Sequence, residues 1–251
     1  MTVNWSKYSA PQAFYPLAGR LIPWFSVMAV ALMGVGLYMG FFVAPTDFQQ
    51  GESYRIIFVH VPAAWMSMFL YVVMAIWAGV GMGLNARLSF MMAQAIAPTG
   101  AMFTFLALLT GAMWGKPTWG AWWVWDARLT SELILLFQYA GVMLLRTSID
   151  DMRRADRSSA VFSLVGVVNV PIIYYSVQWW NTLHQGASVS MSTGSKMAAT
   201  MLMAMLIMTV AFWLYSIAVI LARVRCIVVE RDSLLVWDEK PAVSQEVVEV
   251  R

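Results

Sequence analysis

The two histidines of the chain, His60 and His184, flank a stretch rich in tryptophan. Five tryptophans fall within twelve residues of this stretch, which reads WGKPTWGAWWVWDAR and closes on Asp126 and Arg128. Imidazole nitrogens bind iron, zinc and copper. A structural zinc site takes four protein ligands, whereas haem iron takes one or two axial ligands. Two histidines therefore favour haem over a structural zinc ion.

The side chains beside the histidines suit the other surfaces of haem. Its broad apolar face requires cover, and its two propionates require cations, for which arginine is a bidentate partner. We expect Arg55 and Arg128 at the propionates, with Lys116 nearby, and Asp126 at the closing edge of the stretch. Tryptophan also gathers at membrane interfaces without binding a ligand, so an interfacial belt is the competing interpretation. The tryptophans expected against the haem face are Trp114, Trp119, Trp122, Trp123 and Trp125.

Composition places these residues in a membrane protein. The chain has 251 residues, of which 61% are hydrophobic and 12% charged, against roughly 25% charged residues in soluble domains. Six apolar runs are each close to the ~20 residues that a helix needs to cross a bilayer, and only a helix satisfies its backbone polar groups within one segment. The sequence therefore predicts one all-α domain over residues 1–251, a polytopic bundle of six transmembrane helices with the tryptophan-rich motif at 114–128 and a polar tail at 223–251. The runs cover residues 21–43, 62–84, 92–114, 129–145, 160–180 and 197–222.

Lysine and arginine predict the orientation of the bundle. The N-terminus, the second and fourth connections and the tail lie on one side and hold twelve of these residues, whereas the first, third and fifth connections hold four. Because Lys and Arg favour the cytoplasmic side, both termini are expected in the cytoplasm, with His60, His184 and the tryptophans outside. The basic excess thus reflects loop orientation, and the composition predicts membrane lipid, not nucleic acid, as a partner.

Two conformations are open to the tryptophan stretch. On a helix, Trp119, Trp122 and Trp123 share one face, and Asp126 continues it. On a strand, Trp123 and Trp125 share a face instead. We favour a short helix that lies flat in the membrane interface with its aromatic face towards haem.

Other polar residues in or near the spans are expected to serve the fold. Arg128 and Glu132 are four residues apart on the fourth span and can pair. Asn169 and Gln94, each close to a proline, are expected to satisfy neighbouring helices. The run DDMRRADR at 150–157 is expected to be a solvated loop or a partner contact. A single cysteine and no C-x-x-C-H exclude covalent c-type haem on this chain.

The stretch WGAWWVWDARLTSELILL resembles the tryptophan-rich signature, the WWD domain, of the haem-handling proteins of cytochrome c maturation. Six spans, a length of 251 residues and one outer histidine on each side of the motif resemble the haem exporter protein C family (CcmC) of bacterial System I. The resemblance covers the whole chain, and the larger relatives with this signature have more spans and further histidines. It implies non-covalent haem b, with His60 and His184 as axial ligands, at the periplasmic face of the inner membrane.

The resemblance also implies partners. Haem would pass to a periplasmic haem chaperone, CcmE, on which it becomes covalently attached, beside the ATP-binding-cassette pair CcmA and CcmB and the small helper CcmD. The chain has no G-x-x-x-x-G-K-[ST] motif, so any ATP-driven step would belong to a partner. The resemblance thus predicts a haem-handling transport protein without catalytic residues, which promotes attachment of haem to its chaperone.

Two other classes of protein stay open from the residues alone. A b-type membrane electron carrier would also hold haem between histidines, although its histidines usually lie inside helices, whereas His60 and His184 lie at predicted helix ends. A solute channel or an assembly subunit with an aromatic belt would bind no haem.

Overall fold

Helix accounts for most of the chain. The computed structural model describes residues 9–180, 182, 184, 189–190, 194–195 and 197–238, with the backbone alone at 189–190, 194–195 and 234–238. A π-helix, η2 (Met39–Val43), continues the first helix, a 3-10 helix, η3 (Glu52–Ile56), leads into the second, and β1 (Val189–Ser190) pairs antiparallel with β2 (Gly194–Ser195). The helices are α1 (Pro11–Tyr38), α2 (Ile57–Leu84), α3 (Arg87–Trp119), α4 (Ala127–Ser148), α5 (Met152–Gly166), α6 (Asn169–Trp179) and α7 (Ala199–Asp238).

Within the described part of the chain, six helical segments are long and apolar enough to cross a membrane, which confirms the predicted all-α bundle of six spans. The segments exceed the predicted runs because the helices continue past the apolar residues: the first begins at Pro11 and the last extends to Ser233. The fifth begins at Met152 and is broken into α5 and α6 after Gly166. Pro171, which has no N–H to donate, lies in the first turn of α6. The chain is a multi-pass membrane protein.

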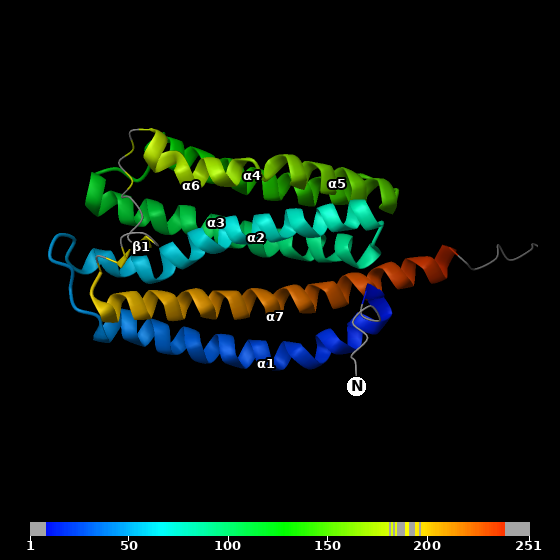
Figure 1. Cartoon of the computed structure of the whole chain (residues 1–251), viewed down its shortest axis with the longest axis horizontal. Coiled ribbons are helices and arrows are strands. Elements are labelled where there is room, and N and C mark those ends of the chain that lie inside the picture. The colour runs from blue at the N-terminus through cyan, green and yellow to red at the C-terminus, as the bar shows by residue number, and fades with distance from the viewer. Residues whose placement is uncertain are drawn as a thin grey trace, which may run out of the picture.

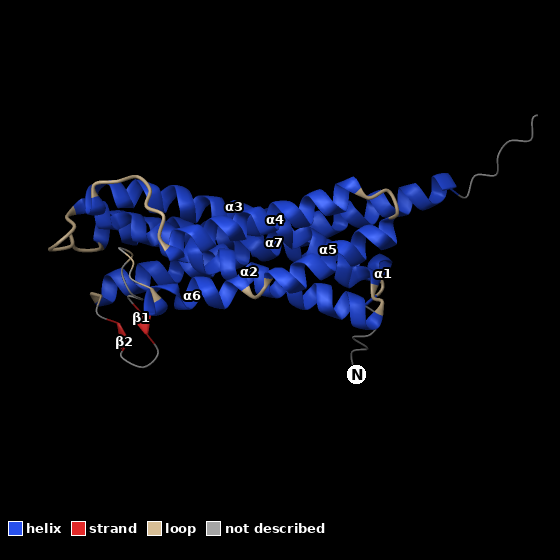
Figure 2. Ribbon diagram, turned by 90° about the horizontal axis from the view of Figure 1, so that it is seen from above, coloured by secondary structure: helices blue, strands red, loops and turns tan. Residues whose placement is uncertain are grey.

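The helices run along a common direction in adjoining layers (Figure 1). α1 packs mainly against α7, α7 also contacts α2 and α3, and α4 contacts α3, α5 and α6. The core is centred on α2 and α3, whose fully buried side chains include Phe58, Tyr71 and Phe103. Seen from above, the connections gather at the two ends of the bundle (Figure 2). Any site built from several connections must therefore lie at one of these ends.

The three connections that the charge pattern places outside meet at one end of the bundle (Figures 1 and 2). We call this the histidine end, because His60, Trp119 and His184 all lie there around one cavity. α1 begins and α7 ends at the opposite end, the terminal end, which also carries the α4–α5 connection. The predicted common location of the histidines and tryptophans is thus confirmed, whereas the membrane side that each end faces stays a prediction.

Two amides in the spans bind neighbouring helices, as predicted. Asn169 is buried at the start of α6 and donates to the Ser131 carbonyl of α4 at 2.9 Å. Gln94 of α3 accepts hydrogen bonds from Arg146 of α4 at 3.2 Å and from Arg231 of α7 at 2.9 Å. These bonds join four helices through polar groups that would otherwise be unsatisfied among apolar side chains.

The run DDMRRADR at 150–157 is not the solvated loop that its charges predict. Asp151 caps α5 by accepting the Arg154 amide at 2.6 Å, so the helix begins within the run. The Asp156 side chain is only 10% exposed and accepts two hydrogen bonds from Arg231 of α7. The run is therefore helical from Met152 onward and joined to α7 through Asp156, whereas Arg153, Arg154 and Arg157 remain exposed.

Candidate functional site

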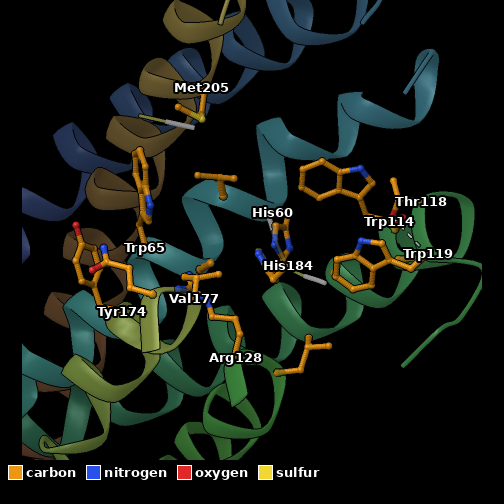
Figure 3. A pocket seen from close by; sticks show the side chains of 16 residues that line it. His60, Trp65, Trp114, Thr118, Trp119, Arg128, Tyr174, Val177, His184 and Met205 are labelled. Atoms are coloured by element: carbon orange, nitrogen blue, oxygen red, sulfur yellow. Dashed lines mark hydrogen bonds between the residues drawn. The ribbon is translucent and has the colours of Figure 1, made fainter. Parts of the chain in front are cut away.

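A cavity at the histidine end lies between α2, α3, α4, α6 and α7 (Figure 3). His60 and Trp114 line it, as do Trp119, Arg128 and His184. Five of the ten predicted site residues thus meet in one cavity. The other lining residues are Val61, Ala64, Trp65, Gly111, Gly115, Thr118, Leu129, Tyr174, Val177, Gln178 and Met205.

The two imidazoles in this cavity lie close to each other. The ring centroids of His60 and His184 are 6.3 Å apart, and the ring planes are tilted by 31°. An axial metal–nitrogen bond is about 2 Å long and the ring centre lies about 1 Å beyond the nitrogen, so two axial imidazoles on one iron have centroids roughly 6 Å apart. The spacing therefore fits haem iron. Among the residues that the structure describes, no cluster of three His, Cys, Asp or Glu could hold a bare metal ion.

Thr110 of α3 orients the buried ring of His60, which lies in the first turn of α2. Nδ1 of His60 lies 3.0 Å from Oγ1 of Thr110. The Thr110 hydroxyl donates its one proton to the Leu106 carbonyl at 2.6 Å, so its oxygen accepts from the imidazole. Nδ1 of His60 then carries the proton, and Nε2 keeps the lone pair that a metal requires.

Aromatic side chains stand on two sides of the imidazoles. Trp114 and Trp119 lie on one side, and Trp65 and Tyr174 lie on the other (Figure 3). Trp114 meets the His60 ring edge-on, with centroids 5.6 Å apart. Trp119 lies 5.9 Å from the ring of the second histidine. The cavity thus offers apolar, aromatic walls beside two imidazoles, an arrangement suited to a flat macrocycle.

The predicted short helix over the tryptophans is wrong. α3 continues through Trp119 and ends at Gly120, whose φ of +79° is the left-handed conformation typical of a helix C-cap. An irregular link then leads to α4, in which Trp122 and Trp125 are 59% and 76% exposed. Trp123 packs edge-on against Trp125 at 5.4 Å. These two rings contact each other, as the extended alternative predicts.

Asp126 connects this link to the second histidine. One carboxylate oxygen accepts the Leu129 amide at 2.8 Å and caps α4. The other accepts a hydrogen bond from the Thr182 hydroxyl. The oxygen of that hydroxyl accepts the backbone N–H of His184 at 3.0 Å. A single carboxylate therefore holds both the start of α4 and the backbone that carries His184.

Arg128 lines the cavity but does not pair with Glu132, contrary to the prediction. Its Nη1 donates to the Ile173 carbonyl of α6 at 3.0 Å, whereas Glu132 accepts from Ser67 of α2 at 2.6 Å. Each side chain finds its partner on a neighbouring helix, because both point into the bundle. Among the described residues no other hydrogen bond engages the Arg128 guanidinium, so its remaining N–H groups can meet an anion.

Arg55 is not brought to this cavity. Its guanidinium donates to the carbonyls of Gly40 and Ala44 and pairs with Glu52, so it joins η2 to η3. Lys116 is exposed and donates to a backbone carbonyl just past the end of its own helix. Among the described residues, Arg128 is therefore the one predicted propionate partner that lines the cavity, and contact between haem and Arg55 stays a prediction.

One face of α3 carries site residues that the sequence pattern could have revealed. Thr110, Trp114 and Thr118 recur every fourth residue, as do Gly111 and Gly115, so they share one side of a helix. The first glycine allows the close approach of α2, because a Cβ there would lie 3.1 Å from Cε1 of the buried histidine. The lining residues without a comparable signal include Trp65, Tyr174, Gln178 and Met205.

The fold and the cavity together define a class of protein. Six helical spans hold two histidines, spaced as the axial ligands of one iron, between aromatic walls at one end of the bundle. The class is that of multi-pass membrane proteins whose site is suited to haem.

Comparison with known proteins identifies the family within this class. The family model of Heme exporter protein C matches residues 4–239. The Heme exporter protein C of Escherichia coli (strain K12) is 52% identical over 182 residues, which cover 72% of this chain and 74% of that protein. The proteins of the same name from Bradyrhizobium diazoefficiens and Haemophilus influenzae are 48% and 42% identical over 215 and 230 residues, covering 86% and 92% of this chain and 81% and 94% of theirs. The chain belongs to the Heme exporter protein C family.

Proposed function

We propose that the chain binds haem b non-covalently at the histidine end and delivers it to a periplasmic haem chaperone for cytochrome c maturation. The observation that carries the proposal is the pair of imidazoles, His60 and His184, with centroids 6.3 Å apart in a cavity walled by aromatic rings. The name that the relatives share, heme exporter protein C, supports haem as the molecule that the chain handles. The chain supplies binding and presentation, and we assign it no catalytic residue.

Each surface of haem has a partner in this proposal. His60, through Nε2, and His184 bind the iron from opposite faces of the macrocycle. Trp114 and Trp119 cover its apolar surface, and Arg128 receives a propionate through the N–H groups that have no acceptor among the described residues. The bound haem is cargo, so the ligands must hold it firmly enough to keep it and loosely enough to release it.

The histidine end is proposed to face the periplasm and the terminal end the cytoplasm, across the inner membrane of a bacterium. Twelve of the sixteen Lys and Arg lie in the segments assigned to the cytoplasmic side, as the positive-inside tendency requires. Trp122 and Trp125, exposed beside the cavity, offer an aromatic surface to the chaperone, CcmE. CcmA, CcmB and CcmD are the proposed membrane partners, and CcmA and CcmB would supply the ATP-driven step.

Purification of the full chain from cells that synthesise haem tests the proposal. Haem is expected to copurify in a fixed ratio to the chain, to give a Soret band, to be extractable because it is non-covalent, and to move to purified chaperone on mixing. A folded protein without Soret absorption would contradict haem binding and favour a solute channel or assembly subunit. Haem that exchanges electrons rapidly and never reaches the chaperone would favour a b-type electron carrier.

The substitution Thr110→Val is expected to weaken haem binding by about 10- to 100-fold, the usual effect of losing the outer partner of a metal-bound histidine. Valine keeps the shape of threonine but removes the acceptor for Nδ1–H of His60, so the ring loses its fixed orientation. The measurement is a haem titration of the apoprotein followed at the Soret band.

Thr104→Val is the matched control for that titration. Thr104 is fully buried on the same helix and donates to the Gly100 carbonyl at 2.8 Å, in the same way as Thr110 bonds its own helix, but it makes no hydrogen bond to His60. Its variant is expected to bind haem normally. Equal haem affinities in the two valine variants would contradict the orienting role of Thr110.

The tryptophans are expected to separate into two groups. Phenylalanine at Trp114 or Trp119, which line the cavity, is expected to lower haem affinity by about three- to tenfold through lost aromatic contact. Phenylalanine at Trp122 or Trp125, which are exposed, is expected to leave haem occupancy unchanged and to slow transfer to the chaperone. The measurements are haem per protein and chaperone-bound haem at matched expression. A flat response at all positions would instead favour an interfacial belt.

A further inference from the structure

Two adjoining cavities at the terminal end collect arginine. The apolar cavity lies between α3, α4, α5 and α7 and includes Arg146 and Arg223, and the basic cavity shares Phe90 and Asp156 with it. Among the described residues that line either cavity, six arginines accompany one aspartate, an excess of five positive charges. The arginines of the basic cavity are Arg87, Arg153, Arg157 and Arg231.

Asp156, the one carboxylate among the described residues that line these cavities, already accepts hydrogen bonds from an arginine. Asp156 accepts two hydrogen bonds from the buried guanidinium of Arg231, at 2.9 and 2.8 Å. Arg146 lies 3.6 Å from the same carboxylate, and both guanidiniums donate to the neutral amide of Gln94. The exposed carboxylate of Glu230 also attracts Arg146, but it is in no ion pair with Arg146 or Arg231. Because an incompletely compensated buried charge is costly, the cluster favours an anion from outside the chain.

The apolar cavity extends from this charge towards the middle of the bundle. Arg146 lies in the last turn of α4, and Val142 lines the cavity one turn deeper. On α3, Pro98 lines it one turn deeper than Gln94. The Ser159 hydroxyl also lines it and is buried without a hydrogen-bond partner among the described residues. Positive charge near the helix ends above apolar walls matches an amphiphile with an acidic head and an apolar tail.

We propose that these two cavities bind an anionic phospholipid of the surrounding membrane. Its phosphate lies against Arg153 and Arg157 at the mouth, and an acyl chain fills the apolar cavity. Basic pockets between transmembrane helices at the cytoplasmic side recognise such head groups. The proposal is independent of haem binding, because the residues of these cavities and those of the histidine cavity do not overlap.

An acidic protein segment would also satisfy the arginines. It would leave the apolar cavity unfilled, since a segment rich in carboxylates carries no long apolar chain. A small free anion would also pair with the arginines and leave the apolar cavity unfilled. The contiguity of the basic and apolar cavities, which share Phe90 and Asp156, therefore favours a lipid over both.

Native mass spectrometry of the full chain tests the proposal with two lipids of identical acyl chains. Phosphatidylglycerol is expected to stay bound after release from the detergent micelle, and phosphatidylcholine is not. Arg153 and Arg157 are exposed at the mouth, so their joint replacement by glutamine is expected to leave the fold intact. Each arginine contributes about fivefold to binding of an anionic head group, so Arg153→Gln with Arg157→Gln is expected to lower retention about 25-fold.

A charge-matched variant controls for the loss of two arginines. Arg20→Gln with Arg154→Gln removes the same charge from exposed positions that line neither cavity, one of them on the same helix. This variant is expected to retain phosphatidylglycerol. Equal loss in both double variants, or equal retention of the two lipids, would overturn the proposal, because net charge and not the cavity would then govern binding.

Competition experiments distinguish the lipid from other anions. Dioctanoyl phosphatidylglycerol is expected to be retained less than the long-chain lipid, because its tails bury less apolar surface. If glycerol phosphate displaces the lipid at equal concentration, the acyl chains contribute nothing to binding. The site would then be a simple anion site, and the proposal would be overturned. Displacement of the lipid by added haem, or by an acidic protein that then occupies the arginines, would overturn it as well.

Discussion

Alanine at either His60 or His184 is expected to abolish the absorption spectrum of a haem with two imidazole ligands and to lower haem content about tenfold or more. Each substitution removes one of the two proposed axial nitrogens and leaves a cavity the size of an imidazole. Added imidazole is therefore expected to restore the spectrum in part. The measurement is the Soret and visible spectrum of the purified protein, oxidised and reduced, with and without imidazole.

Met205 provides the control for this experiment. Its side chain lines the same cavity, and methionine is also an axial ligand of haem iron in many proteins. Met205→Leu keeps the volume, removes the sulfur and is expected to leave the spectrum unchanged. A changed spectrum in this variant, with unchanged spectra in both histidine variants, would replace the proposed pair of imidazoles by methionine ligation.

Loss of the Asp126 carboxylate is also expected to have a large effect on haem binding. Asp126→Ala removes the acceptor for the Thr182 hydroxyl, and Thr182→Val removes the acceptor for the His184 amide. Either change frees the backbone of one axial ligand, so each is expected to weaken haem binding by about 10- to 100-fold. Asp126→Asn keeps an oxygen for the cap of α4 and is expected to lose less. The measurement is haem affinity alongside the free energy of unfolding.

Asp151→Ala is the control that distinguishes the two roles of Asp126, the cap of α4 and the support of the His184 backbone. Asp151 caps α5 by accepting the Arg154 amide, as Asp126 caps α4, but it does not contact the histidine cavity. Loss of a cap costs about 1 kcal/mol, so Asp151→Ala and Asp126→Ala are expected to be destabilised alike. Only Asp126→Ala is expected to lose haem. Equal haem affinity in the two variants would mean that Asp126 acts only as a helix cap.

The spans and the shared end of the two histidines could be predicted because both follow from one-dimensional constraints. A bilayer fixes the length of an apolar run, and alternation of sides along the chain then assigns His60 and His184 to one end. The location of Trp114 at the same end could be predicted because this residue ends an apolar run. The break between α5 and α6 could not be predicted, since Asn169 and Pro171 permit both one kinked helix and two separate helices.

The inner details of the site depend on contacts between helices. Whether Thr110 faces His60 depends on the rotation of α3 against α2, which residue spacing on α3 alone does not determine. Gly120 lies within the stretch predicted to form one helical face, and its left-handed backbone instead ends α3 there. The hydrogen bond between Asp126 and Thr182 joins segments more than fifty residues apart. No local sequence pattern could therefore predict it.

The pairing of α1 with α7 has a consequence for biosynthesis. α1 precedes the other described spans in the chain, and its main packing partner, α7, follows them all, so α1 is synthesised well before α7. Until α7 enters the bilayer, α1 remains surrounded by lipid, which its largely exposed apolar surface tolerates. The contact between the two ends of the chain is of high sequence separation, so it forms late and closes the bundle. Premature termination before α7 would therefore leave α1 without its main packing partner.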